Sequence, residues 1–190
     1  MIKIVTILGS VRPGNNTEKA LALIHEELER RSDVSFVNID PAEFNLSLPG
    51  IENKSGDQLR LNETIKDTDG IIIASPEYHG SYSSTIKLII DNLNFPSLLK
   101  EKPIALLGVA AGQIGAIKSL EHLRSICSHM GAIVLPGPVS IANVNKVFDK
   151  DGNCLDPNIE KRIKDLAQNL LKYINQNICP NVALEQFVRN

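Results

Sequence analysis

A regular alternation between two kinds of segment constrains the fold of this chain more than any other feature of its sequence. Five short runs rich in Ile, Val, Leu and Ala are typical of strands buried on both faces. They span residues 2–8, 34–39, 70–74, 104–109 and 133–135. Amphipathic segments with helical spacing alternate with them and span residues 17–31, 58–66, 84–93, 116–130 and 158–177. Strands that alternate with helices predict βαβ crossovers and a parallel sheet covered on both faces.

The predicted fold class is therefore α/β, and more closely a flavodoxin-like three-layer sandwich. A five-stranded parallel sheet of this kind most commonly has the strand order 2-1-3-4-5. Ligands bind outside the carboxyl ends of such strands, where the strand order reverses between strands one and three. We therefore expect the loops after strands one, three and four to build the functional site.

Chain length favours one domain. A chain of 190 residues can bury one substantial core and is too short for two comfortable ones. We expect a single flavodoxin-like domain over residues 1–190, with residues 178–190 as a C-terminal tail. In that tail Val182, Leu184 and Phe187 can pack on the domain or on a neighbouring subunit, and the sequence does not choose between these.

Charge and hydropathy exclude several classes of partner. The formal net charge is −2 and the Lys and Arg residues are scattered, so we expect no nucleic-acid partner. No apolar run reaches the roughly 18 residues that a membrane-spanning helix needs, so no membrane partner is expected either. The first residues lead directly into a predicted strand, which favours a cytoplasmic protein.

The sequence shows no pattern typical of disulfides, of a metal site or of a serine nucleophile. Cys127, Cys154 and Cys179 are widely spaced, contain no C-x-x-C pair and are odd in number, so neither disulfides nor a zinc site are expected. The His residues on predicted helices lack metal-ligand spacing. No G-x-S-x-G elbow is present, so acyl transfer is not expected.

The loop after the first strand has the composition of a phosphate-binding loop. It spans residues 9–17 and opens a helix, whose N-terminal N–H groups and positive dipole end favour an anion. Ser10, Asn15 and Thr17 add neutral donors, and Arg12 adds a guanidinium suited to a dianion. The loop lacks both G-x-G-x-x-G and the P-loop ending, so a monophosphate fits better than a pyrophosphate. The alternative is a turn whose polar residues only cap the helix.

The loops after the third and fourth strands suit a flat, polar-edged ligand. Residues 75–83 concentrate aromatic and polar groups, including Pro76, Glu77, Tyr78 and His79. Residues 108–115 are rich in small side chains, which let a planar ligand approach backbone N–H groups. The alternative for the first of these two loops is an ordinary surface loop with a buried Tyr.

The chain resembles the NADPH-dependent FMN reductase family, which includes flavin, quinone and azo-dye reductases. The resemblance is carried by three segments taken together: GSVRPGNNT, PEYHGSYS and GVAAGQIGAIKSLEHLR. The resemblance covers about residues 2–135. It implies that Ser10, Arg12, Asn15 and Thr17 hold the phosphate of FMN. It further implies that six residues line the flavin ring, namely Pro76, Glu77, Tyr78, His79, Ala111 and Gly112.

The activity that this resemblance implies is NAD(P)H-dependent reduction. Bound FMN would take a hydride at its N5 atom and pass electrons to free flavin, a quinone or a similar small acceptor, so no side chain is expected to be catalytic. The donor can be NADPH or NADH, and the family implies a homodimer or homotetramer. The alternative is a flavodoxin-like FMN-binding electron carrier or regulatory domain without NAD(P)H turnover, although a net charge of −2 offers a carrier little docking charge.

Overall fold

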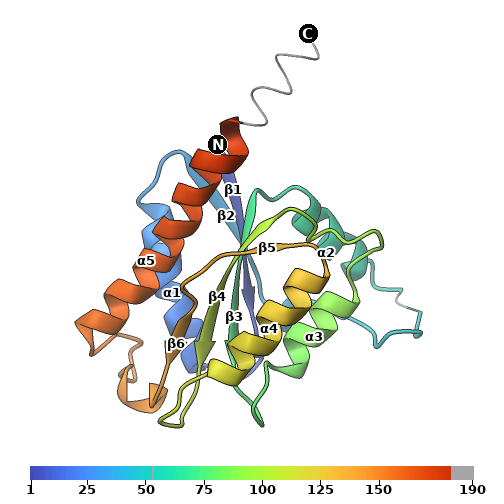
Figure 1. The fold of residues 1–190 in the computed structure, drawn as a ribbon. Helices are drawn as coiled ribbons and strands as arrows, with labels where there is room; N and C mark the ends of the chain where they lie inside the picture. Colours follow the sequence, from blue (N-terminus) through green and yellow to red (C-terminus); the bar gives the residue numbers. More distant parts are fainter. Residues whose placement is uncertain (53, 181–190) are drawn as a thin grey trace.

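A computed structural model, which describes residues 1–52 and 54–180, shows a parallel sheet between two layers of helices (Figure 1). Every pair of neighbouring strands is parallel, and the strand order is β2-β1-β3-β4-β5. The predicted fold class and strand order are confirmed. The strands are β1 (Ile2–Leu8), β2 (Val34–Ile39), β3 (Gly70–Pro76), β4 (Pro103–Val109), β5 (Ile133–Val134) and β6 (Val139–Ile141).

The helices divide between the two faces of the sheet. One face carries α1 (Asn16–Glu29) and α5 (Pro157–Tyr173), and the other carries α2 (Asp57–Lys66), α3 (Ser84–Asp91) and α4 (Ile117–His129). Short helical turns follow β2, β6 and α5, namely η1 (Pro41–Glu43), η2 (Val144–Lys146) and η3 (Ile174–Ile178). All five predicted helices are confirmed, with ends that differ by a few residues.

The central strands β1, β3 and β4 are buried on both faces, whereas the edge strand β2 is partly exposed. In β1, Ile4 and Leu8 pack toward α1 and α5, whereas Val5 and Ile7 pack toward the opposite helices. Every residue of β3 and β4 is buried. Burial on both faces explains why these strands have continuous apolar runs instead of alternating ones.

The sheet has a sixth strand that the sequence does not predict. β5 pairs with one end of β4, and β6 pairs with the other end, so two short strands share the fifth position. Pro136, Gly137 and Pro138 separate them, and proline cannot donate to a sheet ladder. The chain therefore leaves the sheet after β5 and rejoins it at residue 139.

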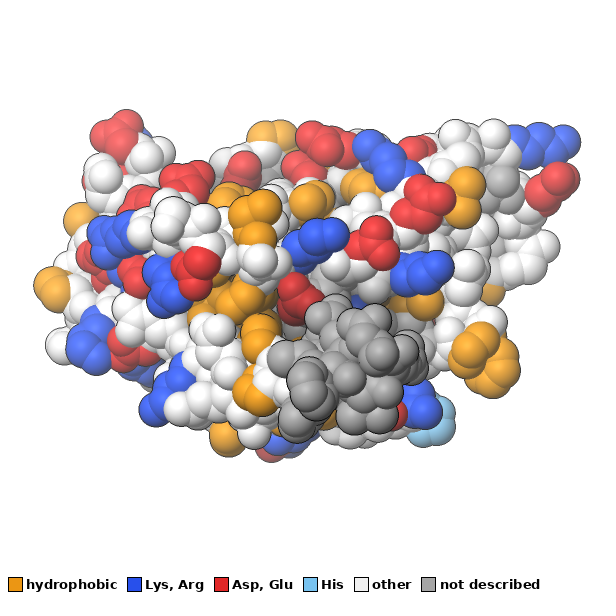
Figure 2. Space-filling view, turned by 90° about the horizontal axis from the view of Figure 1, so that it is seen from above, with side chains coloured by type: hydrophobic (Ala, Val, Ile, Leu, Met, Phe, Trp, Pro, Cys, Tyr) orange, Lys and Arg blue, Asp and Glu red, His pale blue; other side chains and the backbone are white. Residues whose placement is uncertain are grey.

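Charges are mixed on the face of the molecule that is seen from above in Figure 2. Figure 2 shows Lys and Arg side chains interspersed with Asp and Glu side chains on this face. In residues 1–52 and 54–180, no helix is long and apolar enough to cross a membrane. Within the same residues, no cluster of three or more His, Cys, Asp or Glu side chains could hold a metal ion.

Candidate functional site

Three loops meet at the carboxyl ends of β1, β3 and β4, at the lower end of the sheet in Figure 1. Backbone hydrogen bonds tie each loop to the next. The Gly9 amide donates to the Ala74 carbonyl at 2.8 Å, and the Glu77 amide donates to the Val109 carbonyl at 2.8 Å. The sheet thus holds loops that are far apart in the sequence in a fixed mutual position.

A cleft of about 430 Å³ lies among these loops, a size within the usual range of small-molecule sites. Eight of the residues proposed from the sequence line it: Ser10, Arg12, Asn15, Thr17, Pro76, Glu77, Tyr78 and Ala111. The remaining lining residues are Pro13, Gly14, Asn16, Val109, Ala110 and Val144. His79 and Gly112 are not among the lining residues.

The first loop presents donors to one end of the cleft. The Ser10 side chain is buried, and its hydroxyl oxygen accepts a hydrogen bond from the Arg12 amide at 3.3 Å. Thr17 is buried in the first turn of α1, whose first amide groups have no preceding helical carbonyl to bond. Arg12 is exposed. This donor set suits a phosphate dianion.

Asn15 has a structural role in this loop. Its Oδ1 atom accepts from the Glu18 amide at 2.8 Å, which makes it the N-cap of α1. Its Nδ2 atom donates to the Arg12 carbonyl at 2.7 Å. The side chain therefore shapes the phosphate-binding loop, and most of its hydrogen-bonding capacity is used within the loop.

His79 lies at a tight turn, which explains why it does not line the cleft. Tyr78 and Ser81 form an antiparallel bridge, with amide-to-carbonyl distances of 2.9 and 3.1 Å. His79 and Gly80, between them, have φ angles of 50° and 73°. Two successive positive φ angles are the signature of a two-residue hairpin turn. The sequence identified this loop correctly but not the turn within it.

The segment after β6 forms a further wall that the sequence analysis missed. The Val144 amide donates to the Ala110 carbonyl at 3.0 Å, and the Asn143 amide donates to the Gly112 carbonyl at 3.0 Å. The Asn16 side chain also donates to the Asn145 side chain at 2.9 Å, which joins α1 to η2. Because β6 is short and follows a Pro-Gly-Pro stretch, its sequence gives only a weak strand signal.

The residues present fit FMN. Donors gather at the start of α1, where the phosphate would lie, and small side chains leave backbone accessible at the opposite wall, where a flat ring would lie. Gly115 has a φ of +78°, and a Cβ added to it would lie 2.5 Å from the Ser140 hydroxyl. Only glycine fits there, so the third loop can turn sharply beside the cleft.

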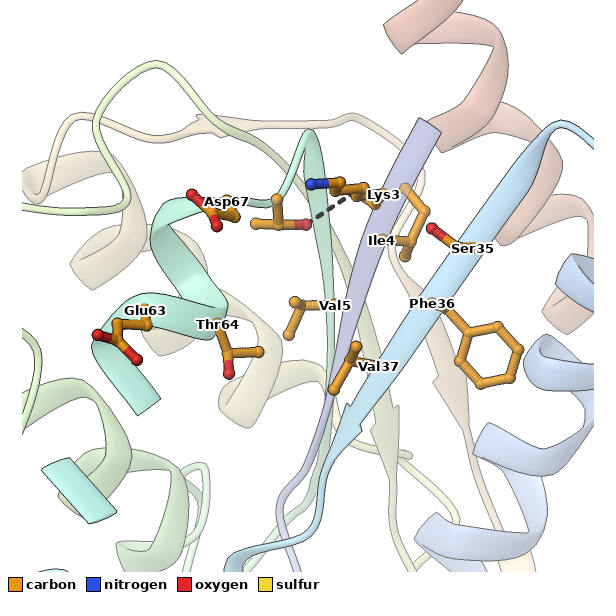
Figure 3. A pocket seen from close by; sticks show the side chains of 10 residues that line it. Lys3, Ile4, Val5, Ser35, Phe36, Val37, Glu63, Thr64 and Asp67 are labelled. Atoms are coloured by element: carbon orange, nitrogen blue, oxygen red, sulfur yellow. Dashed lines mark hydrogen bonds between the residues drawn. The ribbon is translucent and has the colours of Figure 1, made fainter. Parts of the chain in front are cut away.

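A second groove, of about 410 Å³, lies far from these loops (Figure 3). Val5 and Val37 form its floor on β1 and β2, and it is bordered by Glu63 and Thr64 of α2 and by Asp67, which follows that helix. It lies along the edge strand and beside the first half of β1. The carboxyl ends of the strands, where ligands bind in this fold, are elsewhere.

Comparisons with known proteins agree with this geometry. The family model described as NADPH-dependent FMN reductase matches residues 2–146. The FMN-dependent NADPH-azoreductase of Staphylococcus aureus is 26% identical over 185 residues, which cover 93% of this chain and 97% of that protein.

Two solved structures share the fold. The flavoenzyme NAD(P)H:(acceptor) oxidoreductase FerB from Paracoccus denitrificans superposes with a TM-score of 0.77 at 21% identity, covering 93% of this chain and 98% of its own. An NADH:FMN oxidoreductase superposes with a TM-score of 0.74 at 18% identity, covering 90% and 88%. Because the family model spans most of the sequence and includes all three loops, this chain belongs to the NADPH-dependent FMN reductase family.

Proposed function

We propose that this protein holds FMN in the 430 Å³ cleft and uses it to transfer electrons from NADPH or NADH to a small acceptor, such as free flavin, a quinone or an azo compound. The observation that carries the proposal is the meeting of a phosphate-type loop and two ring-type loops in one cleft. That cleft lies at the point where the strand order reverses. Family membership supports the same activity.

At the phosphate end, Ser10, Arg12 and Thr17 would bind the anion together with the first amide groups of α1. Arg12 would supply a charge-assisted hydrogen bond, which is stronger than a neutral one. Asn15 would contribute by holding the loop in shape.

At the ring end, Pro76 and Tyr78 would form one wall and Ala111 the other, with Gly112 beside it. FMN, when bound, supplies the hydride-accepting chemistry. The protein's own residues orient the ring, and backbone N–H groups of the third loop can stabilise negative charge at its edge. Hydride transfer to the flavin therefore needs no side-chain acid or base.

The proposal also includes the domain organisation, the cellular location and the oligomeric state of the protein. We infer one domain, because a single sheet carries all the described helices. The three cysteines are free, which suits the reducing cytoplasm. Exposed apolar side chains near the site, namely Val11, Ile114 and Ile117, favour a homodimer or homotetramer in which a second copy covers them.

Turnover tests this function directly. The purified protein, loaded with FMN, is mixed with NADPH or NADH and with one acceptor at a time: free FMN, a benzoquinone or an azo dye. We expect oxidation of the nicotinamide that depends on both bound FMN and acceptor. Oxidation of neither nicotinamide with any of the three acceptors would instead favour a flavin-binding carrier or regulatory protein.

A further inference from the structure

The N-terminus of α4 is capped by a side chain from a different loop. Its own N-cap residue, Ala116, has no side chain that could accept a hydrogen bond. Instead, the Oε2 atom of Glu77 accepts from the Ser119 amide at 3.0 Å. A carboxylate at this position satisfies an otherwise unpaired helix amide and faces the positive end of the helix dipole.

The loop that carries Glu77 is attached to its surroundings at two further points. The Glu77 amide donates to the Val109 carbonyl of β4 at 2.8 Å. The Ser81 hydroxyl lies 2.9 Å from Nδ1 of His122, one turn further along α4. Residues 77–81 therefore bridge β4 and α4, the two elements that the third loop connects.

The third loop has little freedom once α4 is fixed. A Cβ added to Gly108 would lie 2.6 Å from the Cβ of Ala116, so β4 and α4 already pack closely at this point. The Ala116 amide also donates to the Ser140 hydroxyl at 2.9 Å. A shift of α4 would thus move residues 110–116, which include one wall of the cleft.

We propose that Glu77 is a positioning residue for the flavin: its carboxylate clamps the second loop to α4 and so sets the separation of the two loops that flank the ring. Since Glu77 also lines the cleft, its negative charge opposes the addition of electrons to the flavin and lowers the reduction potential. This inference rests on the proposed FMN function, and it assigns to Glu77 a task besides lining the ring.

Two substitutions separate the clamp from the charge. Glu77→Gln keeps an oxygen that can accept from the Ser119 amide but removes the charge, whereas Glu77→Ala removes both. Glu121→Gln is the matched control, because Glu121 is an exposed carboxylate in the same helix whose partner is Lys118. Three properties are measured for each variant: hydrogen exchange of the Ser119 amide in the apoprotein, the dissociation constant for FMN, and the midpoint potential of bound FMN.

We expect Glu77→Ala to exchange the Ser119 proton roughly tenfold faster and to bind FMN roughly tenfold more weakly, the size of effect that loss of one helix cap produces. Glu77→Gln should keep both values within about threefold of the wild type, yet its midpoint potential should be more positive. Glu121→Gln should leave all three properties unchanged.

Unaltered Ser119 exchange and FMN affinity in Glu77→Ala would overturn the clamp, and an unaltered potential in Glu77→Gln would overturn the role of the charge. If Glu77→Ala does not fold, Glu77→Ser takes its place, because its short side chain keeps a polar group but cannot reach the Ser119 amide, and unaltered Ser119 exchange in that variant would overturn the clamp. Failure of the wild-type protein to bind FMN would refute the proposed function and the role of Glu77 toward the flavin, whereas Ser119 exchange in the apoprotein would still test the clamp itself.

Discussion

In the proposed site, Arg12 is the residue on which we expect phosphate recognition to depend most. It is the cationic side chain among the residues that line the cleft, and its backbone amide donates to the buried hydroxyl of Ser10. A guanidinium distinguishes FMN from riboflavin, because only FMN carries the phosphate. The contribution of this one side chain can therefore be measured with a pair of ligands.

We predict that Arg12→Ala weakens FMN binding by about 10-fold to 100-fold, the equivalent of one hydrogen bond to a charged group. Riboflavin affinity should change by less than about twofold. Arg30→Ala is the matched control, because Arg30 is exposed near the other end of α1. Titration of flavin fluorescence measures the affinities of the wild type and both variants for both ligands, and an equal loss for both ligands in Arg12→Ala would show that Arg12 supports the loop instead of binding phosphate.

Individual residue roles were harder to predict from the sequence than their location. The sequence predicts that Asn15 and His79 lie in the loops after the first and third strands, because apolar runs end at Gly9 and near Ser75. It offers capping of α1 by Asn15 only as an alternative to phosphate binding, and it does not show that His79 occupies a tight turn. Those roles depend on φ angles and on partners that side-chain chemistry alone does not specify.

At the scale of elements, a small polar group joins α1 to the sheet. Nε2 of His25 lies 2.9 Å from the Thr6 hydroxyl of β1, which in turn donates to Oδ1 of Asn38 on β2 at 3.0 Å. The His25 ring stacks on Phe36, with centroids 4.7 Å apart. Burial lowers the pKa of His25, since desolvation disfavours the imidazolium.

This pKa shift predicts how stability changes with pH. Below the ordinary His pKa of about 6.5, the unfolded chain binds a proton that the folded protein resists. The contribution of His25 is therefore complete above that pH and is lost as the pH falls toward the lower pKa of the folded state. Urea unfolding at a series of pH values should show a smaller loss of stability for His25→Gln than for the wild type between pH about 7 and about 5. Parallel curves for the two proteins would contradict it.

The long apolar elements were predicted well, and so was the short strand β5, but the short strand β6 was not. β4 is apolar throughout, β1 is apolar apart from Lys3 and Thr6, and both are buried on both faces over most of their length, so their sequence signal is strong. β6 has three residues and depends on its pairing with Leu107–Val109 of β4. Because a three-residue strand has almost no intrinsic preference, its existence and the cleft wall that follows it could be found only from the tertiary structure.

At the scale of the whole molecule, the site is a consequence of topology. Residues near positions 10, 77 and 111 come together because parallel strands end at one edge of the sheet and the strand order reverses there. This general rule, and not any single motif, allowed the cleft to be placed from the sequence. What it leaves open is the acceptor, since one loaded flavin can reduce several kinds of molecule.

We propose that this cleft holds FMN and that NADPH or NADH reduces the bound FMN. The most direct measurement is the anaerobic absorbance of the FMN-loaded protein after rapid mixing with NADPH and, separately, with NADH. We expect fast loss of the oxidised-flavin band with at least one of the two donors. Tight FMN binding without any loss of that band would contradict the reductase assignment, and failure to bind FMN would contradict the assignment of the cleft itself.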